Sequence, residues 1–233
     1  FAHKGGLHVS AVSKDPKTYE HIDPSLVGNV RNIIVSDQAG KSNIMSRLNK
    51  YGIKIDKNDP KVQTLLNEVK DREFVGYSYD GADASFELLA RRLLGEIPKY
   101  LTISKYDVSV KKESEDKINS FAKAHILVDG KEIVCEGSGN GPVNALDNAI
   151  RSNVDKVGKY SKYLKDLKLV DYKVRILNTG TSATTRVSIE STDREGKSWF
   201  TIGVSPNIIE ASFKALIDSL DYKLYKEKAP ANN

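Results

Sequence analysis

Cysteine is nearly absent from this sequence: Cys135 is the single one among 233 residues. A lone cysteine excludes an intrachain disulfide and a cysteine-rich metal centre, and it suits a reducing compartment. No apolar run approaches the roughly 20 residues needed to cross a bilayer, and no secretory signal peptide opens the chain. We therefore expect a cytoplasmic protein with no membrane segment and no metal site of its own.

A concentration of charge of one sign is also missing. The chain has 36 Lys and Arg against 31 Asp and Glu, a net charge of +5, and the two signs alternate along it. Nucleic-acid-binding proteins usually gather basic residues on one stripe or face, so we expect no nucleic-acid partner. The sequence also offers no Ser-His-Asp set, Cys-His pair or close pair of carboxylates, and we expect no complete active site.

The first part of the chain has the pattern of short helices joined by turns. Asp59 followed by Pro60 is a typical helix start, and Asp83 is placed to cap another helix. Apolar residues recur after both at spacings of three and four, which puts them on one face. We predict helices over 42–51, 60–74 and 84–97.

From about residue 104 the pattern changes to strand-like alternation, and one series of elements then occurs twice. Each series predicts three strands and a helix, with a glycine turn before the third strand and a proline at the first position of the helix. Corresponding positions lie at nearly one spacing: Tyr106 and Tyr172 are 66 residues apart, Gly130 and Gly196 are 66 apart, and Pro142 and Pro206 are 64 apart.

We interpret this spacing as a duplicated β-β-β-α unit. The alternative is an ordinary α+β chain that repeats local patterns by chance. The predicted fold class is therefore α+β, with small helical subdomains first and then two β-β-β-α units related by a pseudo-twofold axis.

Three of the four histidines lie within the first 21 residues. His3 and His8 are five positions apart, across Lys-Gly-Gly in a glycine-rich stretch, so they do not form the i, i+4 pair of a helical zinc site. A structural role in a turn is the default interpretation. A role in proton transfer is the alternative, because histidine titrates near neutral pH.

The stretch GSGNGPVNA, residues 137–145, leads three glycines into the start of a predicted helix. Free amides and the helix dipole favour an anionic group there, such as the carboxylate of an amino acid. A plain turn from strand to helix is the alternative. The corresponding GVSPNIIEA stretch lacks these glycines, which predicts that one unit binds ligand while the other packs.

Several stretches resemble one known family. FAHKGGLHVSAVSKDPKTYEHIDPSLVGN, followed by SDQAGKSNI, resembles the region after the barrel in the isopropylmalate, citramalate and homocitrate synthase family. GSGNGPVNA and SPNIIEASFKAL resemble that family's regulatory domain, and SYDGADASFELLARR is similar to the citramalate synthase branch. The resemblance implies linker subdomains over 1–103, a regulatory and dimerisation domain over 104–225 and a tail over 226–233.

The resemblance also implies a longer enzyme, of which this chain, opening on Phe1, is the C-terminal part. In the family a TIM barrel binds a divalent metal through an HxH motif and adds acetyl-CoA to a 2-oxo acid in a Claisen-type acyltransfer. HxH does not occur here, so we expect neither catalytic metal nor activity from this chain alone. The family's GxH histidine and a following tyrosine reach into the partner subunit's barrel, and the matching residues are His8 and Tyr19. Where many relatives have GIHQDG this chain has GLHVSA, which leaves the contacts of the Gln-Asp pair unmatched.

The family's regulatory domain binds leucine or isoleucine at its dimer interface. Amides and Asn side chains can hold the charged ends of an amino acid while aliphatic residues enclose its side chain. A shifted branch changes binding by only about 1 to 3 kcal/mol, so the sequence does not separate the two effectors. The residues that match the family's site are Gly139, Asn140, Gly141, Val143 and Asn144, and less directly Tyr163, Leu167 and Pro206.

The leading interpretation is the linker and regulatory region of a homodimeric citramalate synthase, controlled by isoleucine. The first alternative is the same region of an isopropylmalate synthase that responds to leucine. The second is a free-standing amino-acid-binding assembly module. The His8 and Tyr19 motif argues against this last alternative, because it has a use only beside a barrel.

Overall fold

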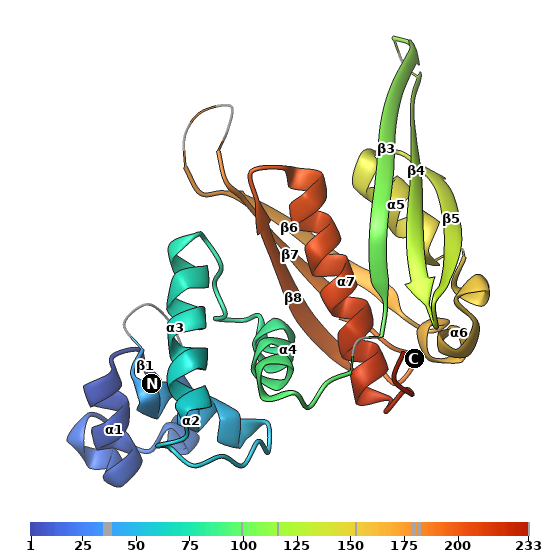
Figure 1. Cartoon of the computed structure of the whole chain (residues 1–233). Helices are drawn as coiled ribbons and strands as arrows, with labels where there is room; N and C mark the ends of the chain where they lie inside the picture. The colour runs from blue at the N-terminus through green and yellow to red at the C-terminus, as the bar shows by residue number, and fades with distance from the viewer. Residues whose placement is uncertain are drawn as a thin grey trace. The chain divides into compact units, whose positions relative to one another are not determined.

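The computed structural model describes all residues except 35–38, 99, 116, 152, 179, 181–182 and 233. It consists of two compact units, Phe1–Leu94 and Gly95–Asn233 (Figure 1). In the first unit the elements are β1 (Ala2–His3), α1 (Gly6–Lys14), η1 (Pro16–Thr18), η2 (Pro24–Val27), β2 (Asn32–Ile33), α2 (Lys41–Lys50), α3 (Pro60–Phe74) and α4 (Asp83–Leu94). In the second they are β3 (Thr102–Ser114), β4 (Lys117–Val128), β5 (Lys131–Gly139), α5 (Pro142–Arg151), η3 (Val154–Tyr160), α6 (Ser161–Leu164), β6 (Lys168–Ile176), β7 (Thr185–Thr192), β8 (Ser198–Ser205) and α7 (Ile208–Lys226).

Helices α2, α3 and α4 enclose one apolar core in the first unit. The stripe predicted for α3 is buried, with Val62 and Val69 among its members, and it meets Ile44 of α2 and Phe86 of α4. Helix α3 begins as predicted, because the Asp59 carboxylate accepts a hydrogen bond of 2.8 Å from the Lys61 amide. The three predicted helices are thus present, with small shifts at their ends.

Two details of the first unit differ from the prediction. Helix α4 ends at Leu94 rather than at 97, because Gly95 adopts a left-handed φ of +76°. The region also contains a parallel pair of two-residue strands, in which Ala2 lies beside Asn32 and His3 beside Ile33. The sequence pattern indicated only helices and turns here, and it missed this pair because residues 30 apart leave no local periodicity.

The second unit holds two antiparallel sheets, ordered β3-β4-β5 and β6-β7-β8. Helix α5 packs on β5 and β4, and α7 packs on β8 and β7, as Figure 1 shows. The predicted order of three strands and a helix is therefore present twice. The pseudo-twofold relation between the two copies stays a prediction.

The two copies differ at their turns. Asp129 and Gly130 form a tight turn with positive φ at both residues, as predicted. The second turn is wider, since the Asp193 amide donates to the Lys197 carbonyl across it at 3.1 Å. Helix α7 starts at Ile208 behind the N-cap Asn207, so the prediction of a proline at the first helical position holds for Pro142 and is wrong for the second copy.

Glycines let each helix approach its sheet closely. A Cβ on Gly203 of β8 would lie 1.9 Å from the Ala211 carbonyl oxygen of α7, and one on Gly137 of β5 would lie 2.3 Å from the Ala149 nitrogen of α5. These two glycines are 66 residues apart. The expectation that the second copy lacks the glycines of the first was therefore incomplete, because Gly203 occupies the place of Gly137.

No helix within the described part of the chain is both long enough and apolar enough to span a bilayer.

Candidate functional site

His8 and Tyr19 lie side by side on the surface of the first unit. Helix α1 buries Val9 and Val12 and leaves His8 exposed. Tyr19 follows η1, is also exposed, and its ring centroid lies 4.3 Å from that of His8 with a tilt of 33°. The structure thus brings together the two residues predicted to act on a partner barrel, with both rings accessible from outside.

The chain around Tyr19 is held by a buried carboxylate, that of Glu20. It accepts two hydrogen bonds from Arg31, at 2.8 and 2.6 Å, and its Oε1 lies 2.8 Å from His3 Nε2. The Arg31 guanidinium, together with His3, lowers the pKa of Glu20 to about 2. His3 therefore has a structural place, in strand β1 rather than in the turn that the default interpretation expected. Sequence reasoning missed Glu20 and Arg31, which no local pattern connects.

Asn43 joins the two amino-terminal motifs that resembled one family. Its side-chain nitrogen donates to the carbonyl oxygens of Lys4 and Ile34, both at 2.8 Å, and its oxygen accepts from the Gly40 amide at 3.0 Å. A Cβ on Gly6 would lie 3.0 Å from the Gly40 nitrogen. The glycines of both motifs thus allow a close backbone contact that Asn43 fastens.

The predicted effector residues Gly139 to Asn144 surround the first turn of α5. The Asn140 amide donates to Asn144 Oδ1 at 3.2 Å, and the Gly141 carbonyl accepts from the Ala145 amide at 2.9 Å. A Cβ on Gly139 would lie 2.4 Å from Asn144 Oδ1, so this glycine is needed for packing. Asn140 and Asn144 are exposed and Gly141 and Val143 are half-buried, which leaves this end of the helix accessible.

Ser120 of β4 is a polar residue beside this turn that sequence reasoning missed. It pairs with Gly139 in the β4-β5 register and shares its helix-facing side. Its hydroxyl is buried and has no hydrogen-bond partner in the described structure. Buried polar atoms usually have a partner, so this hydroxyl stands out among the described residues beside the first turn of α5.

The other three predicted effector residues lie elsewhere. Leu167 is buried, and its carbonyl accepts a hydrogen bond of 3.3 Å from Arg151, at the far end of α5 from Val143. With a rise of about 1.5 Å per residue, that end is about 12 Å away. Tyr163 lies in α6, where Lys162 covers its ring, and Pro206 is exposed before α7. One chain therefore does not gather these residues into one pocket.

Among the residues that the structure describes, no group of three or more His, Cys, Asp or Glu is arranged to hold a metal ion. His125 of β4 faces Glu132, with 3.2 Å between Nδ1 and Oε2, and this contact lowers the pKa of Glu132. His125 is thus a residue of the sheet. Burial raises the pKa of the Cys135 thiol, which makes it a poor nucleophile.

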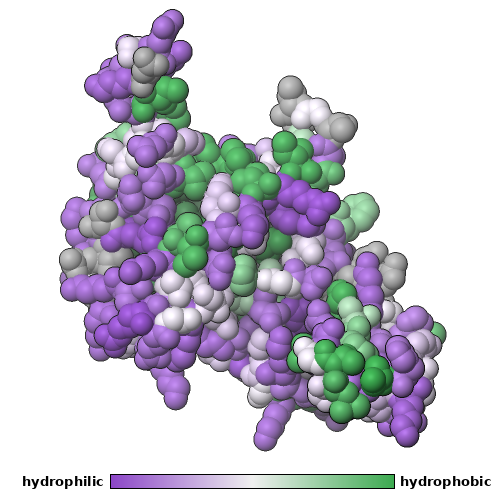
Figure 2. Space-filling model, turned by 180° about the vertical axis from the view of Figure 1, so that it is seen from behind, coloured by the Kyte–Doolittle hydropathy of each residue, from purple (hydrophilic) through white to green (hydrophobic). Residues whose placement is uncertain are grey.

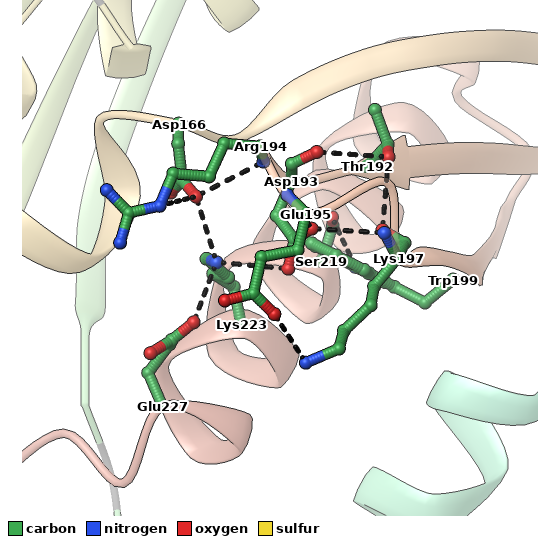
Figure 3. A network of polar contacts seen from close by, with 10 residues as sticks. All are labelled: Asp166, Thr192, Asp193, Arg194, Glu195, Lys197, Trp199, Ser219, Lys223 and Glu227. Atoms are coloured by element: carbon green, nitrogen blue, oxygen red, sulfur yellow. Dashed lines mark hydrogen bonds and ion pairs between the residues drawn. The ribbon is translucent and has the colours of Figure 1, made fainter.

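A network of charged groups fastens the end of α7 (Figure 3). The buried Lys223 ammonium lies 2.9 Å from Glu227, 3.3 Å from Asp166 and 3.4 Å from Asp193. Burial opposes the charge of Lys223, but these carboxylates outweigh it and raise the pKa. Asp193 also accepts from two amides of the β7-β8 turn. The network therefore ties α7 to this turn and to the segment before β6.

Two family models match the chain. Residues 80–224 match the LeuA allosteric (dimerisation) domain, and residues 1–74 match the homocitrate synthase post-HMGL domain-like family. The first match covers α4 and the elements of the second unit as far as residue 224 in α7, and the second covers the His8 and Tyr19 surface.

Curated relatives are similar along nearly the whole chain. It is 47% identical over 231 residues to the (R)-citramalate synthase of Geobacter sulfurreducens and 48% identical over 231 residues to that of Aquifex aeolicus, in both cases over 98% of this chain and 43% of the relative. A probable 2-isopropylmalate synthase of Methanopyrus kandleri is 28% identical over 93% of this chain and 41% of the relative. The chain thus spans less than half the length of these relatives.

Proposed function

Because the chain belongs to the LeuA allosteric (dimerisation) domain family, we propose that it is the C-terminal portion of a citramalate synthase-like enzyme that condenses acetyl-CoA with pyruvate. Identity near one half with citramalate synthases, against 28% with the isopropylmalate relative, is the observation that carries this assignment. In this proposal the chain pairs two subunits, contributes to the partner's active site and senses the end product, isoleucine.

The catalytic contribution comes from His8 and Tyr19. Their rings lie 4.3 Å apart on an exposed surface, so a barrel of the partner subunit can receive both together. The Glu20 carboxylate, held by Arg31 and His3, fixes the backbone next to Tyr19. We assign the pair to the handling of acetyl-CoA or to proton transfer, for which a histidine beside a phenol is suited. The divalent metal implied by the family belongs to the barrel, outside this chain.

The sensing role belongs to the first turn of α5. An amino acid offers a carboxylate, which the amides at a helix start can bind, and an aliphatic side chain, which Val143 can contact. The partnerless hydroxyl of Ser120 beside Gly139 supplies a further polar group. Since Tyr163, Leu167 and Pro206 lie elsewhere in the same chain, a second copy is needed to complete the enclosure.

Replacing His8 by alanine in the protein that includes its barrel should lower kcat by about 100-fold, the usual contribution of an acid-base group. The measurement is coenzyme A release from acetyl-CoA and pyruvate. Tyr19→Phe should also lower kcat, because it removes the hydroxyl. His21→Ala is the matched control, since His21 is exposed in the loop after Glu20. Unchanged turnover in His8→Ala would contradict the catalytic role of His8. Turnover by the wild-type protein with 2-oxoisovalerate instead of pyruvate would assign it to the isopropylmalate branch.

A further inference from the structure

The β3-β4 hairpin continues beyond the rest of its sheet as a two-stranded arm. Strand β5 ends at Gly139, which pairs with Ser120, whereas β3 and β4 continue pairing to Ser114 and Lys117 (Figure 1). A two-stranded hairpin alone is at best marginally stable in water. The arm therefore gains order from whatever covers its apolar side.

Val110 and Ile118 form the apolar side of this arm. Ile118 lies on the same side of β4 as Ala122 and Ala124, which are fully buried on the helix side of the sheet, and Val110 pairs with the buried Ser120. Val110 and Ile118 are nevertheless exposed, because neither α5 nor β5 extends along the arm to cover them.

The second sheet leaves a similar part of its helix side uncovered. Val174 pairs with Val187, which is buried under α7, and Ile176 lies two residues further along β6 on the same side. Both are exposed, as is Ile208 at the start of α7. Within this unit the arm, the end of β6 and the start of α7 lie at one end (Figure 1), and Figure 2 shows hydrophobic surface between the base of the arm and the β6-β7 turn.

We infer that these five side chains, the inner patch, form the surface that takes a second copy of this chain. Their exposed fractions range from 43% to 68%, which is unusual for a group of aliphatic residues at one end of a unit. In a twofold contact, the inner patch of one copy would pack against the inner patch of the other, and both would be covered. The inner patch is Val110, Ile118, Val174, Ile176 and Ile208.

The place of the inner patch in the fold argues for a second copy as its occupant. It lies within residues 80–224, the part that matches a dimerisation domain. Its arm begins where Ser120 pairs with Gly139, the first of the proposed effector residues. A second copy seated there would therefore border the first turn of α5 and close a site that one chain leaves open. This inference rests on the proposed homodimer.

The test compares two double substitutions by sedimentation equilibrium. Ile118→Glu with Ile176→Glu puts a charge on each half of the inner patch, and both positions are exposed in one chain, so folding should be unaffected. We expect the dimer dissociation constant to rise by at least about 100-fold. Each new carboxylate would occur once on each copy, and both would be buried in the same interface. Val110→Glu with Ile208→Glu should do the same.

The control is Phe121→Glu, at a residue 43% exposed on the opposite face of β4, which should leave the dissociation constant within about threefold. A wild-type dimer that tolerates both double substitutions, or that is broken by Phe121→Glu instead, would overturn the inner patch while leaving the homodimer standing. A wild-type chain that is monomeric at micromolar concentration would overturn the homodimer itself.

Discussion

Gly203→Ala should destabilise the second unit by about 3 kcal/mol or more, the upper end of what overpacking costs. The added methyl group would meet the Ala211 carbonyl oxygen at 1.9 Å and the Ala215 nitrogen at 2.9 Å. Both are backbone atoms of α7, so the helix has to move away from β8. That movement also strains the hydrogen bonds of Thr201 to the Ala215 carbonyl and of Trp199 to Ser219.

Urea unfolding followed by fluorescence measures this change directly, because Trp199 is the single tryptophan of the chain and lies in β8. Gly141→Ala is the matched control. Gly141 has an ordinary φ and no atom within 4 Å of an added Cβ, so its substitution should change the free energy of unfolding by less than about 0.5 kcal/mol. Equal stability of the two variants would mean that α7 is not seated this closely on its sheet.

Lys223→Met should destabilise the same unit by about 3 kcal/mol, because it leaves the buried Asp193 carboxylate without its counter-charge. The Lys223 side chain is only 3% exposed and that of Asp193 only 6%. This loss of stability lies at the lower end of the range for broken buried ion pairs, because Asp193 keeps two hydrogen bonds from backbone amides.

The effect of Lys223→Met should also depend on pH. Those amides and Lys223 outweigh burial and lower the pKa of Asp193 in the folded protein. A lowered pKa contributes stability above the unfolded-state value, and this contribution is lost as the pH falls. The difference in free energy of unfolding between wild type and Lys223→Met should therefore become smaller as the pH falls. The control is Lys226→Met, at an exposed position over the Tyr222 and Tyr225 rings. It should lower the free energy of unfolding by less than about 1 kcal/mol at neutral pH. An equal loss of stability in both variants would contradict a special role for Lys223.

Local signals were enough to predict most elements of the fold. Asp59 and Pro60 start α3 because a carboxylate cap and a fixed φ act within one turn. The Asp129-Gly130 turn was predictable because a two-residue hairpin turn needs positive φ at both residues, and Asp-Gly adopts this readily. Pro206 misled the prediction of the next helix start, since Asn207 behind it is the better cap and accepts from two amides.

Contacts between distant residues were not predictable in this way. Glu20 meets His3 across 17 residues and Arg31 across 11, and nothing in hydrophobic spacing signals a buried carboxylate. Ser120 and Gly139 become neighbours only through the register of β4 and β5. Likewise, the resemblance assigned Leu167 to the effector site, and the length of α5 separates the Arg151 end, where Leu167 lies, from Val143.

His8 and Tyr19 lie together in the fold, whereas their catalytic role stays a prediction. The resemblance named both, and the fold adds the reason that they meet: η1 turns the chain after α1 so that Tyr19 comes back beside the helix. The two units thus carry separate tasks in the proposal, one lending groups to a neighbouring barrel and one pairing subunits and sensing product.

Isothermal titration of the chain with isoleucine, leucine and valine tests the central proposal of an end-product-sensing domain most directly. We expect saturable binding of isoleucine, with weaker binding of leucine and valine, since a shifted branch costs about 1 to 3 kcal/mol in an apolar pocket. Tightest binding of leucine would move the protein to the isopropylmalate branch. Absence of binding heat with all three amino acids, from a chain that is dimeric and folded, would contradict the sensing role.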